Sequence, residues 1–180
     1  NANYKGYHVG EGPGTPPRLT DSHVPGRCEW GMTGAGAAHG SHGANSCYKV
    51  VPDCALDAVD YARGSQYAYG SVDQPFAFGS GGGAPYHSSQ SASERGRVGK
   101  NGAGGGRIRI RASGDVHVIG SYLYANGQHG STVVTPAASL GTGGGSGGSI
   151  HVRGRNVWAW QSTFTANGGG SYVAGSGGGG

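Results

Sequence analysis

The amino-acid sequence predicts an all-β protein, a right-handed parallel β-helix with glycine-rich rungs. Three observations support this fold class: an extreme glycine content, an internal repeat of about 41 residues, and a two-residue alternation of apolar and polar side chains. Glycine supplies 41 of the 180 residues, about three times its usual share.

The composition leaves few ways for this chain to fold. Hydrophobic residues make up 34% of it and charged residues 12%, so a compact core would hardly offset the entropy lost on ordering so much glycine. A collagen helix is excluded, because the stretch 107–111 contains no glycine. Disulfides can contribute little to stability, because the chain has three cysteines and these permit one disulfide. A β-repeat with short side chains remains.

The internal repeat consists of two matching stretches. Residues 105–127 read GGRIRIRASGDVHVIGSYLYANG, and residues 147–168 read GGSIHVRGRNVWAWQSTFTANG. The offset between matching residues is 42 in the first halves and 41 in the second halves. One extra residue at the turn of Ser113 and Gly114 accounts for the difference.

Both stretches alternate with a period of two, which is typical of strands. The positions expected on the inner face are apolar in both copies, whereas the positions between them change freely, as from His117 to Trp158. Stacked coils should show this pattern of a constrained inner face and a free outer face. In the first copy the inner positions are Ile108, Ile110, Val116, Val118, Leu123 and Ala125.

Three short strands would form one coil of about 20 residues, and residues 127–148 a second, thinner coil, giving two rungs per repeat. We expect one solenoid segment over residues 1–180, with irregular rungs and loop excursions in 1–100 and regular repeats in 101–180. The expected irregular rungs are 31–44 and 69–84, the excursions are 15–30, 45–63 and 85–100, and a short helix capped by Asp53 is expected at 52–59.

The two ends of the sequence look like parts of the same repeat. Ala2 and Asn3 resemble the exits from the two matching stretches at 125–126 and 166–167, and residues 175–180 resemble the lead-in to such a stretch. We therefore expect this chain to be an excerpt of a longer solenoid.

The ordered succession of AHGSHG, YGS, GSGGG, GGGRIRI, YANG, GTGGGSGGSI and TANGGG resembles the glycine-rich parallel β-helix repeats of very large secreted or cell-surface proteins of protists, algae and bacteria. That resemblance implies extracellular display and a role in adhesion, cell covering or filament formation. It brings no catalytic residues with it.

The acidic residues argue against an enzyme. A polysaccharide lyase or hydrolase on this fold would need clustered carboxylates, but none of the nine acidic residues lies in 116–180. Asp53, Asp57 and Asp60 have the spacing of a solvated helix face. The glycine-rich turns also lack the aspartates of a calcium-binding β-roll. We expect no catalytic residues and no cofactor.

The metal and disulfide candidates are sparse. His39 and His42 lie three residues apart, with His23 upstream, but no matching cysteine or carboxylate set accompanies them, so we expect no metal site. The three cysteines permit one disulfide, and the sequence does not choose among the three pairings. The candidates are Cys28, Cys47 and Cys54.

The predicted outer face carries a column of basic side chains. Like charges stacked along a sheet repel each other. The column is therefore either a solvated face that resists aggregation, or a ladder for an acidic glycan or an acidic subunit surface. Its members are Arg107, Arg109, Arg111, His151 and Arg153.

Outward aromatic residues form the second surface candidate. Trp158 and Trp160 flank Ala159 and should face outward, with Tyr122 and Tyr124 on a nearby strand. Exposed tryptophan is unusual without a partner. Stacking on sugar rings, a lateral protein contact, and burial under an excursion of the chain itself are the alternatives.

These features predict a structural repeat segment of an extracellular fibre, sheath or surface appendage that self-associates. The alternative is an adhesin or glycan-binding module that uses the arginine column and the outer aromatic residues. A polysaccharide lyase and an ice-binding protein are less favoured, the latter because Tyr122 and Tyr124 interrupt a threonine array. A net charge of +4 is too small to indicate nucleic acid, and no run of 18 apolar residues predicts a membrane span.

Overall fold

The computed structural model of the protein describes residues 1–16, 30–32, 35–44, 48–50, 65–71, 73–87, 101–134 and 139–171. These residues contain short strands and no helix, and so no helix able to cross a membrane. The strands are β1 (Trp30–Met32), β2 (Tyr48–Val50), β3 (Tyr86–His87), β4 (Arg107–Arg111), β5 (Val116–Ile119), β6 (Tyr122–Tyr124), β7 (Thr132–Val134), β8 (Ser139–Gly141), β9 (Ser149–Arg153), β10 (Val157–Trp160) and β11 (Thr163–Thr165).

The internal repeat forms three parallel strand pairs, β4 with β9, β5 with β10, and β6 with β11. Ile108 lies opposite Ile150, and Leu123 opposite Phe164. Val116 lies opposite Val157 in the middle pair. The register predicted from the sequence is confirmed at every strand of the repeat, including the change of offset at the turn before β5.

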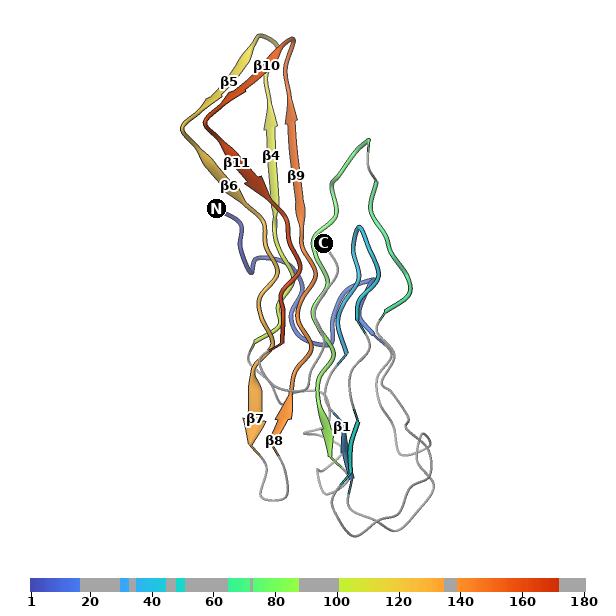
Figure 1. Ribbon diagram of the computed structural model, residues 1–180. Coiled ribbons are helices and arrows are strands. Elements are labelled where there is room, and N and C mark those ends of the chain that lie inside the picture. Colours follow the sequence, from blue (N-terminus) through green and yellow to red (C-terminus); the bar gives the residue numbers. More distant parts are fainter. Residues whose placement is uncertain are drawn as a thin grey trace.

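Each copy of the repeat bends into a triangle, and the second triangle lies on the first (Figure 1). The side chain of Val118 points into the triangle and is buried, and Ile108 and Ile110 beside it are half-buried. Residues between these inner positions face outward, as in β4, whose exposure alternates along all five residues. The corner after β5 and the corner after β10 both use a left-handed residue, Gly120 and Gln161.

Beyond the triangles, the predicted right-handed parallel β-helix is wrong. The described residues of 127–148 do not form a second rung. They run away from the triangles to the antiparallel hairpin β7–β8 and return beside their outward path (Figure 1). The strands β1, β2 and β3 form a separate antiparallel sheet in the order β2-β1-β3. The described strands thus form small sheets of two or three members, and no continuous coil joins them.

The middle of the molecule is a bundle of extended glycine-rich segments. Residues three apart in one segment form hydrogen bonds to the same neighbouring segment, and the residues between them bond to others. In segment 79–83, the amides of Gly79 and Gly82 donate to segment 102–105. The carbonyls of the same two residues accept from segment 7–10. The carbonyls of Ser80 and Gly83 accept from segment 143–146. A polyproline II helix also has three residues per turn. It has no internal hydrogen bonds, so its backbone amides and carbonyls are free to bond to neighbouring segments.

The bundle depends on glycine because the backbones touch. A Cβ at Gly104 would lie 1.9 Å from the carbonyl oxygen of Gly79, and one at Gly144 would lie 1.9 Å from that of Gly169. The buried apolar residues among the described ones are alanines and Val118, and the largest fully buried side chains include Thr142, Ser80 and Ser146. Backbone hydrogen bonds rather than large apolar side chains therefore hold this core.

This bundle explains why the solenoid prediction failed. In a β-sheet a strand has two neighbours in one plane, so glycine runs between strands suggest turns. Without a Cβ, however, a segment can accept neighbours on all sides, and the glycine runs form the core itself. The predicted helix at 52–59 lies outside the described residues, as do most of the predicted excursions.

Candidate functional site

The predicted contact residues lie on three different outer faces of the stacked triangles. The arginine column follows β4 and β9, the tryptophans lie on β10 beside β5, and the two tyrosines lie on β6. The structure therefore does not bring the nine candidates together into one site. Each face has its own chemistry.

The arginine column is partly covered by the segment that contains Phe76 and Phe78. The guanidinium of Arg107 lies 5.2 Å from the Phe78 ring centroid, and its Nη1 donates to the Phe76 carbonyl at 3.0 Å. Arg109 lies 4.6 Å from the Phe76 ring centroid. The ring of His151 meets that of Phe76 edge-on at 5.4 Å. Arg107 and Arg109 thus form cation–π contacts with aromatic rings that the sequence analysis did not predict as partners.

Two members of the column lie beyond this cover. Arg111 and Arg153 are directly opposite each other at the ends of β4 and β9, and both are exposed. The ends of β4 and β9 lie near the tip at which the triangles turn (Figure 1). The two residues there extend the exposed basic surface of Arg107 and Arg109 beyond the phenylalanine contacts.

The outer face of β5 and β10 is exposed. Trp158 is 61% exposed, Trp160 is 68% exposed, and Ile119 opposite Trp160 is 64% exposed. The ring of His117 is opposite Trp158, with the two planes within 7° of parallel and the centroids 6.5 Å apart. Most of the excursions that the sequence suggested as a cover for the tryptophans lie outside the described residues. We call these four residues the aromatic platform.

The tyrosines lie around the corner from the aromatic platform. Tyr122 is 65% exposed, and Tyr124 is half-buried with its ring centroid 5.9 Å from that of Tyr122. Opposite them on β11 are Thr163 and Thr165. This face mixes aromatic and hydroxyl groups and gives no flat threonine array.

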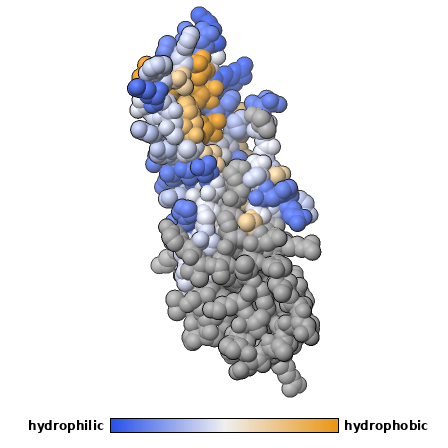
Figure 2. Space-filling model, in the orientation of Figure 1, coloured by the Kyte–Doolittle hydropathy of each residue, from blue (hydrophilic) through white to orange (hydrophobic). Residues whose placement is uncertain are grey.

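The front of the second triangle forms an open end. Val157 is 47% exposed and Phe164 is 40% exposed, although their partners in the first triangle are only partly exposed. Figure 2 shows an apolar patch over the area that β9, β10 and β11 enclose in Figure 1. We call Val157, Ala159 and Phe164 the open end face. Their side chains point into the triangle, and no further layer of the described residues covers them.

The first residues of the chain take the place of a preceding layer. The amide of Ala2 donates to the Tyr124 carbonyl, just as that of Ala125 donates to the Thr165 carbonyl. The side chain of Asn3 accepts from the Asn126 amide at 2.9 Å. In the next layer, the side chain of Asn126 accepts from the Asn167 amide, also at 2.9 Å. The predicted likeness of the first residues to the exits of the repeat is thus confirmed in space.

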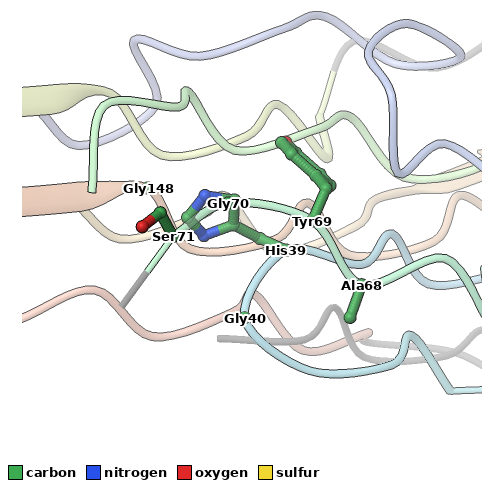
Figure 3. Close-up of a pocket in the computed structure, with 7 residues that line it drawn as sticks. All are labelled: His39, Gly40, Ala68, Tyr69, Gly70, Ser71 and Gly148. Atoms are coloured by element: carbon green, nitrogen blue, oxygen red, sulfur yellow. The ribbon is translucent and has the colours of Figure 1, made fainter. Parts of the chain in front are cut away.

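His39 lines an open pocket of about 340 Å³ in the glycine-rich part of the molecule. The pocket is lined by Ala68, Tyr69, Gly70, Ser71, Gly40 and Gly148 as well (Figure 3). The ring of His39 meets that of Tyr69 edge-on at 4.8 Å. Its Nε2 is buried and has no hydrogen-bond partner among the described residues.

The two candidate metal-ligating histidines do not act together. His39 is only 7% exposed, whereas His42 lies on the surface. In the part of the chain that the structure describes, no three histidine, cysteine or carboxylate side chains gather closely enough to hold a metal ion. His23, Cys28, Cys47 and Cys54 lie outside the described residues, so the disulfide stays a prediction.

Burial of His39 should make the protein less stable in mild acid. Desolvation lowers the pKa of His39 below its usual value of 6.5, so the unfolded chain binds this proton more readily than the folded protein does. The free energy of unfolding should therefore fall as the pH drops through 6.5 and level off below the folded-state pKa. Urea unfolding of the wild type and of His39→Asn over this pH range measures the difference. Equal pH dependence in both proteins would contradict the assignment.

No family model, curated protein or solved structure matches this chain. The resemblance to glycine-rich β-helix repeats therefore stays a prediction. The function has to be argued from the geometry alone.

Proposed function

We propose that this chain is a structural repeat segment of an extracellular fibre, sheath or surface appendage, and that it self-associates by adding layers to its stacked triangles. The support comes from the way one layer docks on the next. Stacked repeats bury their inner faces only against neighbouring repeats, so a layer without a neighbour is incomplete.

The observation that carries the proposal is the asparagine ladder of Asn3, Asn126 and Asn167. The same side chain-to-backbone hydrogen bond recurs from layer to layer, and the flanking backbone bonds recur with it. A contact that is repeated with the same geometry can be repeated again. Asn167, in the second triangle, is exposed and carries the same type of side chain as Asn3 and Asn126.

The open end face is suited to accept such an addition. Val157 and Phe164 expose apolar surface that a further layer would remove from water, with a gain of about 25 cal/mol per Å². Among the described strands, β9, β10 and β11 each pair on one side, with the first triangle. Exposed strand edges pair readily with other chains, and head-to-tail contacts that do not close produce filaments.

Two pockets lined by described residues bear on the alternative of a polysaccharide lyase. The two described pockets are open, one around His39 and one lined by residues that include Tyr4, Gln128 and His129. Neither contains a carboxylate in its lining. A general acid and base pair, which polysaccharide cleavage requires, is therefore not assembled in either.

A charge on the open end face should block self-association. Val157→Asp places a carboxylate where an added layer would have to bury it without a partner, and this costs several kcal/mol. We expect the wild type to form oligomers or filaments as its concentration rises, and the variant to stay monomeric. Sedimentation velocity and negative-stain electron microscopy measure this.

Tyr67→Asp is the matched control, because Tyr67 is 77% exposed and does not belong to the open end face. It should assemble like the wild type. A wild-type protein that is strictly monomeric at all concentrations would refute the proposal, and so would equal assembly of Val157→Asp.

A further inference from the structure

We propose that the aromatic platform is a binding site for an uncharged polysaccharide chain. The site consists of Trp158 and Trp160 with the neighbouring side chains of His117 and Ile119 on the outer face of β5 and β10. It is separate from the open end face, because outer and inner side chains alternate along β10. The two surfaces can therefore be tested independently.

The shape of the platform fits a chain of sugar rings. Trp158 and Trp160 are two residues apart on one strand, so they project on the same side at a spacing of about 6.6 Å. His117 adds a ring nearly parallel to that of Trp158. The C–H faces of a pyranose ring are apolar and flat, and the indole ring is the largest flat apolar surface among side chains. Two indoles in a row thus offer stacking positions along one polysaccharide chain.

The polar groups beside the platform suit the hydroxyls of such a ligand. Gln161 directly follows Trp160 and is a non-glycine residue with a positive φ of 49°. Its counterpart in the first triangle is Gly120, with φ of 56°, so glycine is the less strained choice at this corner. Non-glycine residues held in this conformation cluster at ligand-binding sites. The amide side chain of Gln161 is available both to donate to and to accept from sugar hydroxyls.

The charges argue for a neutral rather than an acidic glycan. The platform contains no lysine, arginine, aspartate or glutamate. Asp115, just before β5, accepts a hydrogen bond from the Asn156 side chain at 2.9 Å. The arginine column lies on a different face, along β4 and β9, where Arg107 and Arg109 contact phenylalanine rings.

The size of the platform argues against a protein partner. Two strands of four residues give a surface about 13 Å long and about 10 Å wide. A stable protein–protein interface covers about 800 Å² on each partner, several times this area. A ribbon-shaped ligand such as a polysaccharide needs no more than the platform offers.

The test is retention of the purified chain on polysaccharides of different charge. Microcrystalline cellulose and chitin are assayed by pull-down, and soluble xylan, mannan and β-1,3-glucan by affinity electrophoresis, with polygalacturonate as the acidic comparison. We expect binding to at least one neutral polysaccharide, and a loss of at least tenfold in Trp158→Ala and Trp160→Ala. A tenfold loss corresponds to about 1.4 kcal/mol of binding free energy.

Two variants serve as controls. Tyr67→Ala removes an equally exposed aromatic side chain elsewhere, and Arg109→Ala removes a charge from the arginine column. Both should bind neutral polysaccharide like the wild type, and circular dichroism should show that all four variants are folded.

Three outcomes would overturn the inference. These are binding to polygalacturonate alone, no binding to any neutral member of the panel, and equal binding by the tryptophan variants. Because self-association is measured separately with Val157→Asp, a failure here leaves the structural proposal standing, and the reverse is also true.

Discussion

Replacement of Gly147 by alanine is expected to prevent the chain from folding stably. A Cβ at this position would lie 1.7 Å from the carbonyl oxygen of Ala166 and 2.5 Å from its carbonyl carbon. Both are backbone atoms, which cannot swing away as a side chain does. Overpacking of a core usually costs about 1–3 kcal/mol, and a backbone clash this short should exceed that. Against a typical stability of about 5–15 kcal/mol, Gly147→Ala should lower the midpoint of urea unfolding severely.

Gly114→Ala is the matched control, because nothing lies within 4 Å of a Cβ built there. An alanine that the backbone tolerates restricts the unfolded chain, and such a change is stabilising by about 0.4–1 kcal/mol. We therefore expect opposite signs for the two glycine substitutions. Equal, small effects would mean that the segments of the bundle are not packed as closely as described.

The register of the repeat could be predicted from the sequence because side chains report on it. Apolar residues on the inner face, such as Ile108 and Ile150, are constrained in both copies, and a two-residue period assigns them to one face of a strand. The structure pairs these residues directly. The change of offset from 42 to 41 between the first and second strands could also be predicted, because one copy has a single extra residue at the turn.

The glycine bundle could not be predicted in the same way. A run such as residues 143–148 has almost no side chains, so it carries no apolar period from which a fold can be derived. Its partners are set by which backbones can approach, and these come from distant parts of the chain. The amide of Gly105, for example, donates to the Ser146 carbonyl, and that of Ser146 to the Ser80 carbonyl.

The candidate surfaces show the same division. That Trp158 and Trp160 face outward followed from the alternation within β10, and the structure shows both to be exposed. The partners of the arginine column did not follow, because Phe76 lies 31 residues before Arg107 in a segment without a strand pattern. Local periodicity gives the direction of a side chain, but long-range packing decides whether that direction is free.

Buried serines are the part of the bundle where side chains replace the backbone in hydrogen bonding. The Oγ atom of Ser80 accepts from the Gly14 amide at 2.8 Å and lies 2.8 Å from the Tyr69 hydroxyl. The Ser80 amide donates to the Oγ atom of Ser146 at 2.8 Å. Both serines are fully buried. In a core with few large apolar side chains, such fully satisfied groups connect segments that come from three parts of the chain.

Ser80→Ala should therefore lower the free energy of unfolding by about 1–3 kcal/mol, the usual cost of leaving a buried donor without its acceptor. The Gly14 amide would lose its acceptor in a buried place, because the alanine side chain has no oxygen. The matched control is Ser71→Ala, because Ser71 also accepts from a backbone amide, that of Gln74, but at the exposed surface. There water replaces the lost oxygen, and the change should stay within about 0.5 kcal/mol. Urea unfolding followed by circular dichroism measures both. If Ser80→Ala were as mild as Ser71→Ala, the buried serines would not be connecting the bundle, and close glycine packing alone would hold it.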